Sequence, residues 1–128
     1  MVKCNWKYFT EDELKCKGTS ECSMDSSFMG KLISLREVYN KPIHLSSAYR
    51  SKEYNDKVGG VPNSPHTHGK AVDILASGQD AYKIMTVALQ LGFTGIGVSQ
   101  KGPHDKRFIH IDTMENSSSS PRPTIWSY

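Results

Sequence analysis

The sequence predicts an α+β domain, in which helices pack on one side of a small and mainly antiparallel sheet. The first observation is the order of the expected elements, which is helix, strand, loop, strand, helix, strand, strand. The second is the short loop between the last two strands, because a short connection favours antiparallel pairing. The chain has 128 residues, which suits a single domain over 1–128 with a Ser/Pro-rich C-terminal tail over 114–128.

The expected helices are marked by their ends and by the spacing of their apolar residues. Thr10 precedes a run of acids, which favours a short helical turn over 10–14. Apolar residues at helical spacing predict a helix over 25–39, which Pro42 ends because the residue before a proline avoids the α region. A second helix is predicted over 79–91, with Gly92 where a C-cap glycine belongs.

The expected strands are short runs of apolar and β-branched residues between turn-forming segments. They are residues 43–48, 71–75, 93–99 and 108–113. The segment over 49–69 is rich in Gly, Pro, Asn and Ser, so we expect mostly loop with one helical turn at 51–57. The tail begins with low-complexity sequence and ends in Trp126 and Tyr128, which we expect to dock back on the domain.

Charge and hydropathy limit the function classes. The net charge of +3 is weak evidence for nucleic-acid binding and slight evidence for an anionic partner such as a cell-wall polymer. No apolar run approaches the roughly 18–20 residues of a membrane span. The N-terminus lacks the apolar segment of a signal peptide. We therefore expect no nucleic-acid or membrane partner, and synthesis in the cytoplasm, with release by another factor if the protein works outside.

The cysteines are Cys4, Cys16 and Cys22, an odd count confined to the first 22 residues. This pattern does not match a disulfide framework. The spacing between Cys16 and Cys22 also differs from the C-x2-C of structural zinc sites. We expect partly buried free thiols, with a Cys16–Cys22 bridge or a second metal site as the alternatives.

Histidines and acids fall where two predicted strands could bring them together. His66 lies in a loop, Gly69 allows a sharp bend, and Asp73 lies in the strand that follows. Strand alternation turns Asp73 away from its apolar neighbours Val72 and Ile74. An isolated buried carboxylate is costly, so Asp73 needs a partner or a metal.

The strand over 108–113 repeats this pattern. Ile109 and Ile111 share one face, whereas His110 and Asp112 share the other. Together with His66 and Asp73 they would form a pocket of His and Asp, which are ligands that zinc accepts. Each segment also has a purely structural explanation. The turn around His66 could be a polar turn, Asp73 a hydrogen-bonded strand acid, and the strand with His110 an edge strand with a polar face. Spacing alone leaves the metal site and these alternatives open.

The stretch S64-x-H66-x-x-G69-x-A71-x-D73 resembles the zinc motif of the M15 peptidases at every defined position. This family includes D-alanyl-D-alanine carboxypeptidases and dipeptidases and phage endolysins, and the hedgehog signalling domain shares its fold. Two shorter stretches, FIHIDT from Phe108 and SAYR from Ser47, resemble the second zinc motif and an upstream segment. The resemblance covers about 8–113 and implies a hedgehog/DD-peptidase-like fold.

The resemblance also implies a set of site residues. One Zn²⁺ would be held by His66, Asp73 and His110. Arg50 would hold the substrate carboxylate or stabilise the oxyanion, which suits its planar guanidinium. Ser64 and His68 are the expected substrate contacts.

The general base is where the sequence departs from the family. Members carry an acid three residues before the last ligand or a His two before it, but here these positions are Arg107 and Phe108. We expect Asp112, on the same strand face, to act as the base, or instead to orient His110 as a hydrogen-bond partner. His104 and Asp105 are the reserve candidates.

The function implied is that of a monomeric, single-domain zinc peptidase acting on peptidoglycan stem peptides. Cleavage would be of the D-Ala-D-Ala carboxypeptidase or the endopeptidase type, as in a phage endolysin that reaches the cell wall at lysis. The alternative is a zinc-stabilised binding module of the same fold that has lost the chemistry, a reading that the missing acid ahead of His110 keeps open.

Overall fold

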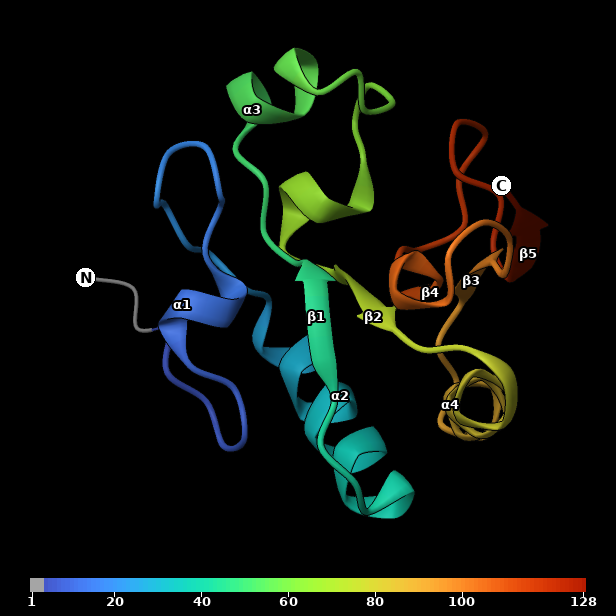
Figure 1. Ribbon diagram of the computed structural model, residues 1–128. Helices are drawn as coiled ribbons and strands as arrows, with labels where there is room; N and C mark the ends of the chain where they lie inside the picture. Colours follow the sequence, from blue (N-terminus) through green and yellow to red (C-terminus); the bar gives the residue numbers. More distant parts are fainter. Residues whose placement is uncertain (1–3) are drawn as a thin grey trace.

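The computed structural model describes residues 4–128, which form a five-stranded sheet with the order β1-β2-β4-β3-β5 (Figure 1). The strands are β1 (His44–Ser47), β2 (Ala71–Leu75), β3 (Gly95–Ser99), β4 (Phe108–Asp112) and β5 (Thr124–Ser127). The pairs β1–β2, β2–β4 and β3–β4 are antiparallel, whereas β3–β5 is parallel. The α+β class and the mainly antiparallel sheet are therefore confirmed.

Four helices accompany the sheet within residues 4–128, and the two long ones, which contact each other, both lie in the lower half of Figure 1. They are α1 (Glu11–Leu14), α2 (Ser26–Tyr39), α3 (Lys52–Lys57) and α4 (Gly78–Gln90), with short 3-10 turns η1 (Pro65–His68) and η2 (His104–Lys106). Within the described part of the chain, no helix has the length and apolar character that crossing a bilayer requires.

The helix ends follow the predicted signals. Thr10 and Glu13 form a capping box at α1. The side chain of Asp25 accepts a hydrogen bond from the Phe28 amide at 2.9 Å and caps α2. At the other end of α2, Asn40 takes a left-handed conformation with φ 60°, which is a common way to end a helix.

Strand alternation divides the sheet into an apolar face and a polar face. Val72, Ile74, Ile109 and Ile111 are at most 1% exposed and pack into the core with the helices. On the opposite face, Asp73 of β2 is the direct partner of His110 of β4. Because β4 lies between β2 and β3, the polar residues of this face gather at the centre of the sheet.

The C-terminal tail differs from the prediction. Its last residues form β5, which adds to the edge of β3 and places Trp126 beside Gly97. Ser117 and Ser120 exchange backbone hydrogen bonds of 3.0 and 3.2 Å, so the Ser-rich stretch is an ordered turn. Trp126, within β5, and Tyr128, directly after it, pack against His110 and Phe108 and so dock on the domain as expected, but the strand itself was not predicted.

The cysteine prediction was wrong for Cys4 and Cys22, which form a disulfide, and confirmed for Cys16, which is a buried free thiol. The Cα atoms of the disulfide lie 6.2 Å apart, a usual separation for such a bond. Cys16 is buried instead beside Ser51, with 3.7 Å between Sγ and Oγ. The pairing depends on how the first 22 residues fold back on themselves, which cysteine spacing does not reveal.

This disulfide should contribute measurably to stability. It closes a loop of 18 residues, for which the loss of unfolded-state entropy corresponds to about 3 kcal/mol. We expect a reductant to lower the urea midpoint of the wild type to that of the double variant Cys4→Ser/Cys22→Ser. The same reductant should leave the double variant unchanged, and an equal shift in both proteins would assign the effect elsewhere.

Candidate metal centre

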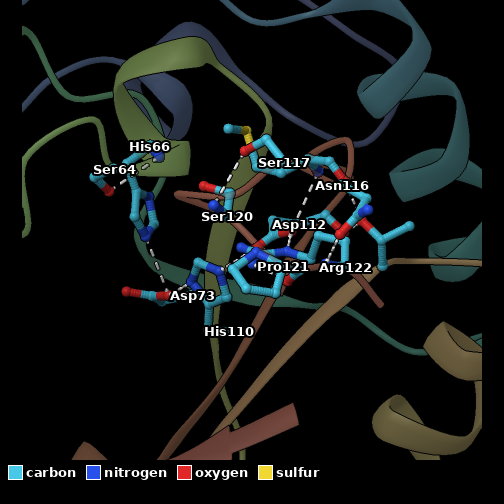
Figure 2. A network of polar contacts seen from close by, with 12 residues as sticks. Ser64, His66, Asp73, His110, Asp112, Asn116, Ser117, Ser120, Pro121 and Arg122 are labelled. Carbon is cyan, nitrogen blue, oxygen red and sulfur yellow. Dashed lines mark hydrogen bonds and ion pairs between the residues drawn. The ribbon is translucent and has the colours of Figure 1, made fainter. Parts of the chain in front are cut away.

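Three buried side chains from η1, β2 and β4 converge on the polar face of the sheet (Figure 2). Asp73 Oδ1 lies 3.3 Å from His66 Nε2 and 3.0 Å from His110 Nδ1. One donor atom from each residue lies within 4.8 Å of the other two. All three residues are buried, with 3%, 7% and 3% exposure for His66, Asp73 and His110. The distances between their donor atoms show that they come together as the sequence predicted.

His66 is held in place by the turn that carries it. The Ser64 hydroxyl accepts a hydrogen bond from the His66 amide at 3.2 Å and caps η1. Gly69 ends the turn with φ 67°, and a Cβ there would collide with the Ser23 carbonyl. His66 Nδ1 lies 2.7 Å from the Ala48 carbonyl, which can only accept, so Nδ1 carries a proton and the neutral ring keeps its Nε2 lone pair for the position that the three donor atoms share.

His110 uses its two ring nitrogens in the opposite way to His66. Its Nε2 lies 2.7 Å from Asp112 Oδ2 and its Nδ1 faces Asp73. When Nε2–H donates to Asp112, the Nδ1 lone pair is free for a metal. Two imidazole nitrogens and one carboxylate oxygen thus point at one position, and a three-residue set of this kind is typical of catalytic zinc. The residues present fit a zinc ion.

Asp112 is completely buried and makes four hydrogen bonds. Its Oδ1 accepts from Arg122 Nε at 3.0 Å and from the Met114 amide at 3.2 Å. Its Oδ2 accepts from His110 and from Arg122 Nη2 at 2.9 Å. A carboxylate has about four acceptor sites, so none is left for a reacting water. These contacts match the second role predicted for Asp112, the orientation of His110.

Two glycines of β3 make space for this arrangement. A Cβ at Gly95 would collide with the Asp112 carboxylate. A Cβ at Gly97 would lie 2.7 Å from Trp126 Nε1 and 3.1 Å from the Cβ of His110. Trp126 uses that space to pack against His110, with ring centroids 5.1 Å apart. The two glycines therefore leave room for the Asp112 carboxylate and for the Trp126 ring, which is tilted by 50° against the His110 ring.

A cavity of about 530 Å³ opens over the three candidate ligands. Arg50 and the loop over 59–65 line it, together with tail residues 119–122, Trp126 and Tyr128. The Arg50 guanidinium donates to Asn55 Oδ1 at 3.2 Å, and Asn55 Nδ2 donates to the Val61 carbonyl at 2.9 Å. Asn55, which is 1% exposed, thus connects Arg50 to the loop that borders the cavity.

Of the remaining predicted residues, one lines this cavity and three do not. Ser64 is buried and lines it, with its hydroxyl engaged by the His66 amide. His68 is exposed and hydrogen-bonded to Asn63 at 2.6 Å, outside the cavity lining. His104 and Asp105 are exposed on η2 and do not line it either. Their predicted roles stay untested predictions.

The sequence did not predict that Asn55, Arg122 and Trp126 shape the site, although Trp126 was expected to dock on the domain. Asn55 lies in α3, where a helical turn over 51–57 was predicted, but nothing in the sequence distinguishes Asn55 from its neighbours. The tail did carry a signal, because Ile125 and Ser127 alternate with Trp126 and Tyr128 as in a strand.

Neighbouring charges shift the pKa values of the candidate ligands. Burial alone would raise the pKa of Asp73, but hydrogen bonds and charges from His110 and His66 outweigh it and hold that pKa well below its usual value. For His110, burial would lower the pKa, but hydrogen bonds to Asp112 and Asp73 raise it above 6.5. When both ring nitrogens of His110 are protonated, Nε2 donates to Asp112 and Nδ1 donates to Asp73.

These shifts predict how the pH affects the stability of the metal-free protein. The raised pKa of His110 stabilises the fold below about pH 6.5, and this contribution is lost as the pH rises through the folded-state pKa. The lowered pKa of Asp73 stabilises it above about pH 4 and is lost as the pH falls through the folded-state value. The metal-free protein should therefore be most stable between about pH 4 and 6.5.

We expect the Tm of the chelator-treated protein to fall between about pH 6 and pH 9, as measured by calorimetry. Zinc should reverse the trend, because a metal requires the neutral form of His110 and binds more tightly as the pH rises. The variant His44→Gln, at an exposed position of β1, is the matched control and should retain the decline. A flat Tm over this range would contradict the pKa shift of His110.

Comparison with known proteins agrees with the geometry. The family model described as Peptidase M15 matches residues 7–112, a range that includes all three candidate ligands. The zinc D-Ala-D-Ala carboxypeptidase of Streptomyces albus G is 37% identical over 83 residues, which are 63% of this chain and 32% of the relative. The chain thus spans about a third of the length of that curated relative. From the family match over most of its length, the chain belongs to the peptidase M15 family.

Proposed function

We propose that this protein is a zinc-dependent peptidase that hydrolyses a peptide bond in the stem peptides of peptidoglycan. The observation that carries the proposal is the buried cluster of His66, Asp73 and His110 on the floor of a cavity. The name of the relative, a zinc D-Ala-D-Ala carboxypeptidase, supports the metal and the substrate class.

The three ligands would hold one Zn²⁺. Zinc in such a site polarises a carbonyl oxygen and lowers the pKa of a water molecule to about 7. The protein's contribution is to fix the ligands beforehand, since the Ala48 carbonyl and Asp112 each hold one imidazole in the tautomer that a metal needs.

Arg50 is the group that would receive the substrate. Its guanidinium lines the cavity and is steadied by Asn55. A guanidinium can bind a terminal carboxylate with two parallel hydrogen bonds, or stabilise the charge that develops on the scissile carbonyl oxygen. The first role would favour carboxypeptidase cleavage, whereas the second is compatible with endopeptidase cleavage.

The place of action is also part of this proposal. We infer that a monomer acts on the cell wall after release, in the manner of a phage endolysin. The Cys4–Cys22 disulfide supports action outside the cytoplasm, because such bonds persist in oxidising surroundings. The net charge of +3 suits an anionic wall polymer.

One observation favours a second candidate, a zinc-stabilised binding module without catalysis. Among residues 4–128, Asp73 is the only Asp or Glu whose side chain lines the cavity, and it is a candidate ligand. Asp112 has its acceptor sites occupied, and Asp105 is exposed elsewhere. The cavity thus lacks a carboxylate that is free to act as general base, which favours the binding module. A peptidase with this site would have to move its protons through water or a non-carboxylate group.

The test is digestion of purified peptidoglycan by the metal-free protein, before and after addition of zinc, with mass spectrometry of the muropeptides. Zinc-dependent release of defined fragments would support the peptidase and identify the bond cleaved. Stoichiometric zinc without any cleavage would favour the binding module. Cleavage that persists in a chelator and in His66→Ala would exclude both candidates.

A further inference from the structure

We propose that Arg122, in the C-terminal segment over 113–128, is a positioning residue of the metal centre that acts through Asp112 on His110. The inference rests on the proposed zinc site. Within residues 4–128, the polar contacts of Arg122 are with Asp112, Asn116 and Pro121 and not with a candidate ligand. Its influence would pass through two consecutive hydrogen-bonded contacts, from the guanidinium to Asp112 and from Asp112 to His110 Nε2.

The contact between Arg122 and Asp112 is a buried, two-point ion pair. Nε and Nη2 of the guanidinium lie 3.0 and 2.9 Å from the two carboxylate oxygens. The Arg122 side chain is 9% exposed and that of Asp112 is 0% exposed. A parallel pair of this kind fixes the plane of the carboxylate as well as its position.

The guanidinium is itself held from other directions. Its Nη1 donates to the Pro121 carbonyl at 2.9 Å, and its carbon atom lies 5.3 Å from the centre of the Trp126 ring. The Arg122 amide donates to Asn116 Oδ1 at 2.9 Å, which ties the backbone to the ordered Ser-rich turn (Figure 2). Arg122 therefore has little freedom to follow Asp112 if that side chain moves.

The consequence reaches the metal through His110. Asp112 keeps the His110 ring oriented with Nε2–H directed at Oδ2, which aims Nδ1 at Asp73. Without Arg122, the Asp112 carboxylate would lose two of its four hydrogen bonds and would be free to turn. Loss of a group that orients a metal-binding His typically costs 10–100-fold in metal affinity.

This inference extends the site beyond the part of the chain that matches the family. The match ends at residue 112, whereas Arg122 lies 10 residues further along. The tail returns to the site because β5 pairs with β3 and places Trp126 against His110. The structure thus assigns the tail to the metal centre rather than to a peripheral extension.

The experiment compares zinc affinities of the metal-free proteins by competition with a chromogenic chelator. We expect Arg122→Gln to bind zinc 10–100-fold more weakly than the wild type. Cobalt substitution should report a changed visible absorption spectrum, which a loss of general stability would not produce. The matched control is Arg107→Gln, whose guanidinium contacts the Gly102 carbonyl at the surface and should leave zinc affinity unchanged.

A double-variant cycle tests the route through Asp112. If Arg122 acts through Asp112, then adding Arg122→Gln to Asp112→Asn should weaken zinc binding by less than about 2-fold further. If the double variant instead loses zinc affinity by the product of the two single-variant losses, the proposed route through Asp112 is overturned. Arg122→Lys, which keeps the charge but not the two-point contact, should give an intermediate affinity, and this variant carries the test if Arg122→Gln does not fold.

The outcomes separate this inference from the proposed function. Wild-type zinc affinity in both Arg122 variants, with zinc-dependent cleavage intact, would overturn the role of Arg122 and leave the peptidase standing. Zinc binding that weakens as expected in a protein without cleavage would support Arg122 and count against the peptidase. A wild-type protein that binds no zinc would overturn both.

Discussion

Replacing His66 by alanine is expected to weaken zinc binding by roughly 10²–10³-fold and to lower peptidoglycan cleavage with it. His66 would supply one of the three protein ligands, and its Nε2 is already aimed at the shared position by the Ala48 carbonyl. In structural zinc sites, four protein ligands together bind zinc with about 10–16 kcal/mol, so one ligand accounts for about 3–4 kcal/mol and its loss for roughly 10²–10³-fold in affinity. Competition with a chelator and muropeptide release measure the two losses in the same sample.

The control for this prediction lies two residues away. His68 is exposed and bound to Asn63, so His68→Ala changes the same residue type in the same turn without touching the candidate ligands. We expect wild-type zinc affinity in His68→Ala. Equal losses in the two variants would show that the turn, rather than the His66 imidazole, is what the substitution disturbs.

The meeting of Asp73 and His110 was predictable because strand alternation is a local property of the sequence. Val72 and Ile74 must face the core, which sends Asp73 to the opposite face, and the same reasoning places His110 on the polar face of β4. Only the pairing of β2 with β4 was needed to bring Asp73 and His110 together, and the observed register makes them direct partners. The motif around His66 supplied the third ligand.

The partners of these ligands were not predictable, because they come from distant parts of the chain. The Ala48 carbonyl and the Arg122 side chain lie 18 residues before His66 and 10 residues after Asp112, respectively. Neither contact follows from a local pattern. For the same reason the sequence left the role of Asp112 open, since its four hydrogen bonds include two from a tail predicted as low-complexity.

The disulfide shows the same limit in the N-terminal segment. Cys4, Cys16 and Cys22 are chemically equivalent in the sequence, and the folded segment decides which two meet. A bridge between the backbones of Trp6 and Phe9 and a hydrogen bond from the Cys16 amide to the Glu21 carbonyl at 2.7 Å shape this segment. Both contacts are formed by backbone atoms, which carry no residue-specific signal.

Replacing Arg50 by alanine is expected to lower kcat/KM by about 10²–10³-fold, the usual effect of losing a group that stabilises an oxyanion. Zinc affinity should change little, because Arg50 contacts Asn55 rather than a ligand side chain. The charge alone does not suffice for a two-point contact, so Arg50→Lys should recover only part of the loss. Arg107→Ala, at the surface, serves as the matched control.

The kinetic constants of Arg50→Ala also distinguish the two roles of this residue. If the guanidinium binds a terminal carboxylate in the ground state, the loss lies mainly in KM, and amidation of the substrate's C-terminus should impose the same loss on the wild type. If it acts on the developing oxyanion, the loss lies in kcat, and amidated and free substrates should suffer equally. The first result would assign carboxypeptidase specificity to the cavity, whereas the second would leave room for cleavage inside a cross-link. Unchanged kinetics would remove Arg50 from the mechanism, and the guanidinium would then serve to fix the loop over 59–65 through Asn55.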